Sequence, residues 1–165
     1  MKIGVASVGA TRESLGVFGG WGAFRDRSPD RCVATAVPAR TGRHPTWRPF
    51  ASVALWPGRH RRDVVFVRLS AARAAGTPVT LSVGDRRFRL VGEGSGVWSP
   101  DPATDHALVA ALRSEHSLSI AAISARGEPF ADSYLLAGAA TAIDAAALGC
   151  SRSGDPSTAR IRTKT

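Results

Sequence analysis

The sequence predicts a mainly β protein: an antiparallel, immunoglobulin-like β-sandwich with two short α-helices. Three observations support this expectation. Apolar residues fall in short runs, and several runs alternate strictly with polar residues, as in strands with one buried face. Glycine, proline and aspartate separate these runs at short intervals. Only two stretches carry apolar residues at helical spacing, so helices are expected to be a minor part of the fold.

Eight segments are expected to be strands. The first two form a hairpin, because Ser28-Pro29-Asp30 between them is a turn signal. Gly84-Asp85 gives an equally short connection between the fifth and the sixth. The expected ranges, in order, are 18–26, 31–39, 48–57, 63–70, 78–84, 86–94, 116–125 and 129–136.

Alternation within the strands indicates which side chains face the core. The clearest case is residues 78–84, where Val79, Leu81 and Val83 share one face and hydroxyl side chains occupy the other. The strand that follows the first hairpin is expected to turn Phe50 inward. The inward faces of several such strands would form the core of a sandwich.

Two segments are expected to be helices. Residues 99–115 have Asp101 in the N-cap position, followed by a proline that suits the first helical turn. Residues 137–150 are alanine-rich, with an apolar stripe that ends at Cys150 and with Gly149 as a helix stop.

The chain is long enough for one domain with a sizeable hydrophobic core, at 165 residues and 44% hydrophobic composition. No apolar run reaches the roughly 20 residues needed to cross a bilayer as a helix. The net charge of +9 comes almost entirely from arginine, since the only lysines are Lys2 and Lys164. Arginine and alanine richness is typical of GC-rich coding sequences, so the charge alone does not indicate a nucleic-acid partner, although it would attract a polyanion.

Three regions are expected along the chain. Residues 1–17 are an N-terminal segment in which Lys2, a short apolar run and the small residues of Val8-Gly9-Ala10 resemble the remnant of a signal peptide. The alternative is a frayed terminus that leads into the first strand. Residues 18–150 form the β-sandwich domain, and residues 151–165 form a disordered basic tail.

The two cysteines, Cys32 and Cys150, lie near opposite ends of the expected domain. In an oxidising compartment they would form a disulfide, and in the cytosol they would be two buried free thiols; the residues alone leave both alternatives open. The sequence has no C-x-x-C or H-x₃-H spacing, so neither a metal nor another cofactor is expected.

The residues favour a non-enzymatic protein. None of the four histidines accompanies a G-x-S-x-G elbow, and all four are expected on the surface. The alternative is an uncharacterised hydrolase, which would need His106 or His116 within hydrogen-bond reach of an acid and a nucleophile. The four tryptophans are expected to pack in the core and at its rim.

Two arginine clusters form a candidate anion-binding surface. They would serve a polyanion-binding or nucleic-acid-binding module if they shared one face. Nucleic acid is the less favoured partner, because arginines that alternate with apolar residues also occur in any half-buried strand. The residues are Arg59, Arg61, Arg62, Arg87 and Arg89.

The order of these features resembles the invasion-associated locus B family. The resemblance covers residues 18–150 and rests on "FGGWGAFRD…RCVATAVP", "ASVALWP", "VTLSVGDRRFRL" and "YLLAGAATAIDAAAL". Trp21 matches an early tryptophan of the family and Cys32 the cysteine that follows it. The chain departs from the family pattern at Ala139, where phenylalanine is usual, and in lacking a cysteine pair in mid-chain.

The resemblance implies a function as well as a fold. Members are exported bacterial β-sandwich proteins with no established enzymatic mechanism, so it implies a non-catalytic protein that acts on envelope or protein partners. It also implies a periplasmic or secreted location, with the cytoplasm as the second alternative. An exported location favours the disulfide between Cys32 and Cys150. The identity of the partner and the oligomeric state do not follow from the sequence.

Overall fold

The structure, a computed structural model, describes residues 11–151, so residues 1–10 of the expected N-terminal segment (residues 1–17) and most of the expected tail lie outside the described residues. These described residues form ten strands and two α-helices. The strands are β1 (Arg12–Phe18), β2 (Trp21–Arg27), β3 (Asp30–Ala36), β4 (Phe50–Trp56), β5 (Arg61–Arg68), β6 (Val79–Val83), β7 (Arg86–Glu93), β8 (Gly96–Trp98), β9 (Ser117–Ile123) and β10 (Pro129–Leu135). The helices are α1 (Pro102–Ser114) and α2 (Ala139–Ser151), and a short 3₁₀ turn, η1 (Pro57–Arg59), joins β4 to β5.

The strands pair in the order β1-β2-β3-β4-β5-β8-β7-β6-β9-β10, and every pair is antiparallel. Strand β7 joins two halves of the sheet, because its first part pairs with β6 and its last part with β8. The change of partner falls near Gly92, which has a φ of +154° and where a Cβ would lie 2.1 Å from the carbonyl oxygen of Gly96. Glycine is therefore required at this corner.

Inward residues of both halves of the sheet belong to one hydrophobic cluster, as in a sandwich. The expectation of a mainly antiparallel β fold with two helices is confirmed, and the sheet remains open, with β1 and β10 at its edges. Alternation predicts the buried face of β6 correctly, since Val79, Leu81 and Val83 are all buried.

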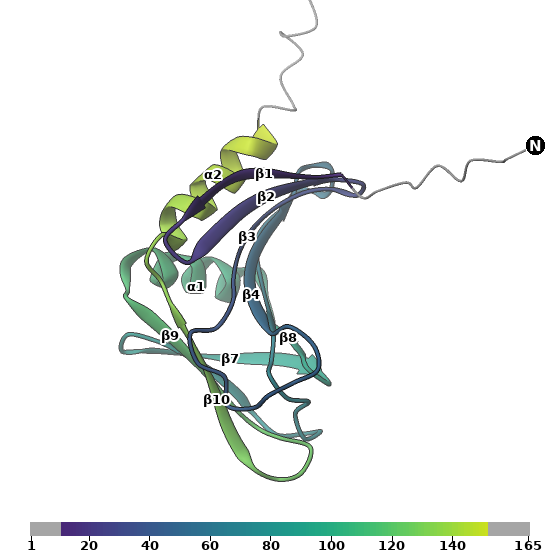
Figure 1. The fold of residues 1–165 in the computed structure, drawn as a ribbon, viewed down its shortest axis with the longest axis vertical. Helices are drawn as coiled ribbons and strands as arrows, with labels where there is room; N and C mark the ends of the chain where they lie inside the picture. Colours follow the sequence, from purple (N-terminus) through teal and green to yellow (C-terminus); the bar gives the residue numbers. More distant parts are fainter. Residues whose placement is uncertain (1–10, 152–165) are drawn as a thin grey trace, which may run out of the picture.

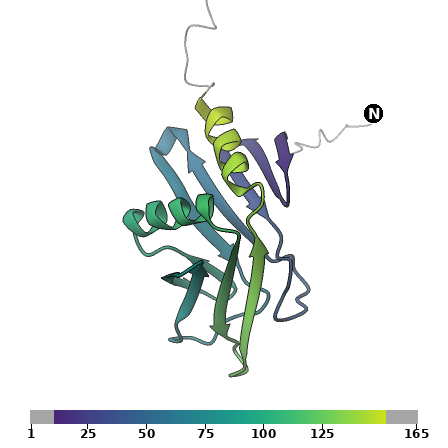
Figure 2. The same cartoon turned by 90° about the vertical axis from the view of Figure 1, so that its left-hand side faces the viewer.

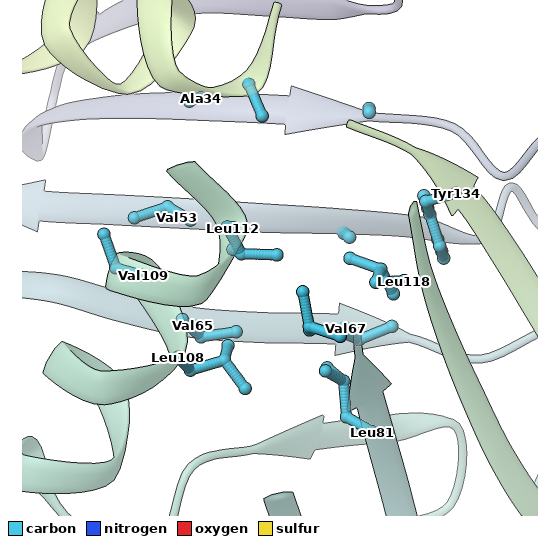
Figure 3. Packing of buried hydrophobic residues seen from close by; sticks show 14 of the residues in the cluster. Ala34, Val53, Val65, Val67, Leu81, Leu108, Val109, Leu112, Leu118 and Tyr134 are labelled. Atoms are coloured by element: carbon cyan, nitrogen blue, oxygen red, sulfur yellow. The ribbon is translucent and has the colours of Figure 1, made fainter. Parts of the chain in front are cut away.

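The larger half of the sheet consists of β1 to β5 and β8. Both helices cover the same face of this larger half (Figures 1 and 2). Helix α2 lies mainly against β2 and β3, and α1 lies mainly against β5. Leu108, Val109 and Leu112 of α1 extend toward Val53 of β4 and Val65 of β5 (Figure 3). No described helix has the length and hydropathy to span a bilayer.

A disulfide links the last helix to the sheet. Cys32 of β3 and Cys150 of α2 are bonded, are separated by 118 positions in the sequence, and have Cα atoms 5.9 Å apart. Both residues are buried, at 0% and 3% exposure. The bond therefore fixes the C-terminal end of α2 on the inner face of β3.

The start of the domain differs from the sequence-based expectation. Residues 12–17, placed in a separate N-terminal segment, form most of β1, which pairs with β2. The turn after β1 meets the start of α2, where the N–H of Gly20 donates to the carbonyl of Ala137 at 3.3 Å. The Nε1–H of Trp21 donates to the carbonyl of Leu135 at 2.9 Å. Strand β1 is part of the domain because it pairs with β2 and packs against α2.

Helix α2 also ends later than expected. It continues past Gly149 to Ser151. A Cβ at position 149 would lie 2.4 Å from a methyl carbon of Leu15. Gly149 therefore permits close packing of α2 on β1 and is not a helix stop.

Candidate functional site

The face of the sheet that carries no helix contains a cavity among the described residues. In Figure 1 the helices lie to the left of β3 and β4, and the opposite face of these strands bends around open space to the right. The cavity on that face, here called the outer hollow, measures about 690 Å³. Its lining residues are Arg12, Arg31, Val33, Thr35, Phe50, Ser52, Ala54, Trp56, Arg61, Val64, Val65, Phe66, Trp98, Ser99 and Asp105.

Strand alternation places the lining residues of β3 and β4 on the outer face, whereas the core residue Val65 and Asp105 of α1 border the hollow on the side of the helix. On β4, Ala51 and Val53 are core residues, so the side chains between and beyond them point away from the helices. Phe50 belongs to this second set and lines the hollow, which corrects the expectation that it faces the core. Both faces of β4 carry apolar residues, so periodicity alone does not decide which face is buried.

The hollow exists because small side chains occupy its centre. Val33 pairs with Ala54, and Thr35 pairs with Ser52, across β3 and β4. Larger side chains surround this centre, and the rings of one pair, Phe50 and Phe66, have centroids 5.8 Å apart. The surrounding aromatic residues are Phe50, Trp56, Phe66 and Trp98.

The floor of the hollow offers few hydrogen-bond donors. The hydroxyl of Thr35 donates to the carbonyl of Ala51 at 3.0 Å. The hydroxyl of Ser52 donates to the carbonyl of Phe66 at 3.3 Å. Since each hydroxyl has a single proton, both floor hydroxyls are already used as donors. The strands beneath the floor are interior strands with paired backbones. The floor therefore suits apolar groups.

One end of the hollow is cationic. Arg12 pairs with Asp26 at 2.7 Å, and Arg31 also reaches Asp26 at 2.7 Å. The hydrogen bond from Arg12, together with that from Arg31, lowers the pKa of Asp26 to about 2. Arg61 forms no ion pair with the described residues. This end thus carries three guanidinium groups against two acidic groups, Asp26 and the buried Asp105, on which Arg61 acts electrostatically.

An indole ring lies among these cations. Trp56 pairs with Arg61 across β4 and β5, and the guanidinium carbon of Arg61 lies 5.9 Å from the ring centroid. The guanidinium carbon of Arg31 lies 6.0 Å from the same ring. Both distances are within the range of cation–π contacts. The contacts orient the two arginines beside the cavity.

A buried carboxyl group borders the hollow on the side of α1. Asp105 is 7% exposed and accepts the backbone N–H of Val65 at 2.9 Å. Burial raises the pKa of Asp105, and the bond from Val65 opposes that rise. The neighbouring His106 is 84% exposed and lies 3.7 Å from Asp63. Asp105 therefore fastens the start of α1 to β5, and His106 faces solvent as expected.

A second buried carboxylate, Asp132 on β10, is fully hydrogen-bonded. It accepts the N–H of Gly42 at 2.9 Å, the N–H of Ser70 at 2.8 Å and the hydroxyl of Ser70 at 2.5 Å. These bonds hold the segment before β4 and the end of β5 against β10. The arrangement is that of a structural anchor.

The structure brings one of the five arginines of the candidate anion-binding surface to the hollow. Arg61 lines it, and Arg59 and Arg62 flank Arg61 in the sequence but are not lining residues. Arg87 and Arg89 lie on β7 opposite Ser82 and Thr80 of β6. Arg12 and Arg31, which complete the cationic end, were not among the predicted site residues. Both pair with Asp26 on β2, the strand next to β3, and no local sequence signal indicates that arrangement.

The tryptophans divide between core and hollow. Trp21 is buried in the core at 1% exposure, whereas Trp98 is 42% exposed at the rim. Trp56 and Trp98 line the hollow. Among the described residues, no three histidine, cysteine, aspartate or glutamate side chains cluster as metal ligands would.

Comparison with known proteins identifies a similar fold. No protein-family model and no curated protein sequence matches the chain. A solved structure, invasion associated protein B from Bartonella henselae, matches with a TM-score of 0.57 and 19% sequence identity. The match covers 83% of this chain and 98% of that chain. The resemblance to invasion-associated proteins is therefore confirmed at the level of the fold.

Proposed function

We propose that the protein is a non-catalytic, exported bacterial β protein of the invasion-associated type, which acts by binding an envelope or protein partner. The observation that carries this proposal is the disulfide between Cys32 and Cys150 within a fold shared with invasion associated protein B. Disulfides persist in oxidising compartments and are rare in the cytosol. The bond therefore supports a periplasmic or secreted location.

The outer hollow supports a binding role. One face of the larger half-sheet is covered by both helices, and the other carries a cavity lined by aromatic and arginine side chains. Concave, largely apolar surfaces with a few polar groups at the edge are typical of binding sites. The hydrolase alternative finds no support at His106, whose side chain is exposed to solvent and lies 3.7 Å from the carboxylate of Asp63.

The polyanion alternative has one observation in its favour, the three arginines at one end of the hollow. It would need the other cluster residues to act with them on the same polymer. Binding to heparin that weakens steeply with salt, and that is lost in an Arg87→Gln, Arg89→Gln double variant, would favour it.

Cell fractionation tests the proposed function. The tagged full-length chain would be expressed in its own host, and the periplasmic, secreted and cytosolic fractions would be compared, with a cytosolic enzyme as the leakage marker. We expect the chain outside the cytosol, and we expect the purified oxidised protein to sediment with envelope fragments from that host. Retention in the cytosol, or failure to sediment with any envelope fraction, contradicts the proposal.

A further inference from the structure

We infer that the outer hollow binds a small anionic amphiphile: a single acyl chain that lies along the floor, with its acidic head group at Arg12, Arg31 and Arg61. This inference deepens the proposed function and rests on it, because it takes the hollow as the binding surface. It assigns the ligand by chemistry alone.

The polarity of the hollow runs along the strands. Trp56 and Arg61 lie at one end of the paired strands. At the other end Phe50 pairs with Arg68, which is not a lining residue and whose guanidinium lies over the ring of Trp47. Between these two ends, Val33, Ala54 and the hydroxyl groups of Thr35 and Ser52 form the floor. Both hydroxyl groups already donate their protons to backbone carbonyls. A ligand that matches this layout has a charged end and a long apolar body.

The length of the hollow suits an acyl chain. From Trp56 to Phe50 the strand advances six residues, and at about 3.3 Å per residue this is about 20 Å. An extended long-chain acyl group has a similar length. The central row of small side chains leaves room for a chain, and the flanking rings of Phe50 and Phe66 would contact its sides.

The same geometry disfavours polar polymers. A glycan or a single nucleic-acid strand would bring many hydroxyl, phosphate or base groups to a floor whose hydroxyl protons are already donated. A peptide could not add as a strand there, because β3, β4 and β5 are paired on both sides. Burying unpaired polar groups costs free energy, so an alkyl chain is the better occupant.

The cationic end determines the charge of the head group. Arg12, Arg31 and Arg61 outnumber the acidic groups of Asp26 and Asp105, so the net charge of this end is positive. Arg61 forms no ion pair with the described residues. A carboxylate placed near Trp56 would contact guanidinium groups on two strands. Charge-assisted bonds of this kind are stronger than neutral ones.

Titration calorimetry with a chain-length series tests the inference. Octanoate, decanoate and dodecanoate would be added to the oxidised full-length protein, each below its micelle concentration. We expect affinity to rise about fourfold per added methylene group, which corresponds to about 0.8 kcal/mol. Dodecyl maltoside and dodecyltrimethylammonium have the same chain with neutral and cationic heads, and each should bind at least about tenfold more weakly than dodecanoate.

Three variants locate the site. Ala54→Phe fills the centre of the hollow and should weaken dodecanoate binding by at least about tenfold. Thr35→Phe fills it from a less buried position and serves if Ala54→Phe does not fold, as judged by thermal unfolding. Arg61→Gln should weaken dodecanoate severalfold and leave dodecyl maltoside unchanged. Arg89→Gln removes the same charge on β7, outside the lining, and should leave both affinities unchanged.

Several outcomes overturn the inference. The first is a fatty acid affinity that does not depend on chain length. The second is equal affinity for the three dodecyl amphiphiles, and the third is undiminished binding of dodecanoate by both Ala54→Phe and Thr35→Phe. A further contradictory result is that dodecanoate does not bind, while the filling variants abolish either binding of single-stranded DNA or dimer formation. That result would assign the hollow to another partner. If no amphiphile binds, yet the chain is exported and sediments with envelope fragments, this inference fails and the proposed function stands. If the chain stays in the cytosol but binds dodecanoate, the proposed function fails and this inference stands.

Discussion

Gly138 lies against the carbonyl oxygen of Phe18, so close that a Cβ at position 138 would lie 1.8 Å from that oxygen. The contact joins the turn after β1 to the residue before α2. Gly138 also has a φ of +88°, a conformation that L side chains rarely adopt. The edge strand β1 and the last helix therefore depend on each other at this point.

Replacing Gly138 with alanine should lower the free energy of unfolding by about 3 kcal/mol or more, because the methyl group must displace the backbone. Gly127→Ala is the matched control, since Gly127 has a similar φ of +82° and open space around its Cβ position. That variant should cost about 1 kcal/mol from backbone conformation alone. Urea denaturation of both variants checks the difference, and equal losses would contradict the contact.

Removing the disulfide should destabilise the domain. The double variant Cys32→Ala, Cys150→Ala should lose about 2–5 kcal/mol of unfolding free energy, because the bond closes a long loop. Ser151→Ala, at the same end of α2, should change the stability by less than about 0.5 kcal/mol. Urea denaturation under non-reducing conditions provides the measurement. A double variant as stable as the control would show that the bond does not hold α2 in place.

The pair of arginines on Asp26 should make the stability fall in acid. The folded-state pKa of Asp26 is about 2, below the value of about 4 expected in the unfolded chain. Its contribution is therefore present above pH 4 and lost as the pH falls toward 2. Between those limits the wild type should lose about 1 kcal/mol more than Asp26→Asn, a value reduced by solvent screening. The unfolding free energy of both proteins would be measured by urea denaturation between pH 4 and pH 2. The same pH dependence in the wild type and in Asp26→Asn would contradict a stabilising role of the Asp26 carboxylate.

Asp105 should have the opposite dependence. Its pKa is raised by burial, so the folded state holds the proton more tightly than the unfolded state. The wild type should therefore lose stability relative to Asp105→Asn as the pH rises from about 4 through the raised pKa. The amide oxygen of asparagine can still accept the N–H of Val65, which makes this variant a fair comparison. Urea midpoints across pH 4–7 provide the test, and a stability difference that does not change with pH would contradict the assignment.

The sequence predicts those parts of the fold that depend on local patterns. The alternation of β6 and the N-cap of α1 are correct, since Asp101 accepts the N–H of Thr104 at 2.7 Å. Strand β1 is not predicted because its residues are largely exposed and show no clear alternation of buried and exposed positions, although it pairs with the adjacent β2. The short β8 was missed because its three residues form no recognisable period.

The candidate site was less predictable than the fold. Arg61 was singled out as part of a basic cluster, but its relation to Trp56 depends on the irregular register between β4 and β5. The hollow depends on small residues that meet across β3 and β4, such as Val33 and Ala54. A sequence shows neither which strands adjoin nor which face of a strand with two apolar faces is covered. These arrangements are tertiary and require the structure.

The redox state of Cys32 and Cys150 in the protein made by its own host is the most direct test of a disulfide-linked fold outside the cytosol. The chain would be trapped with an alkylating agent without reductant, and its intact mass would be measured. We expect that Cys32 and Cys150 take up no alkyl group and that the chain is two hydrogen atoms lighter than its reduced form. Alkylation of both thiols in the folded protein would contradict the disulfide-linked, exported fold proposed here.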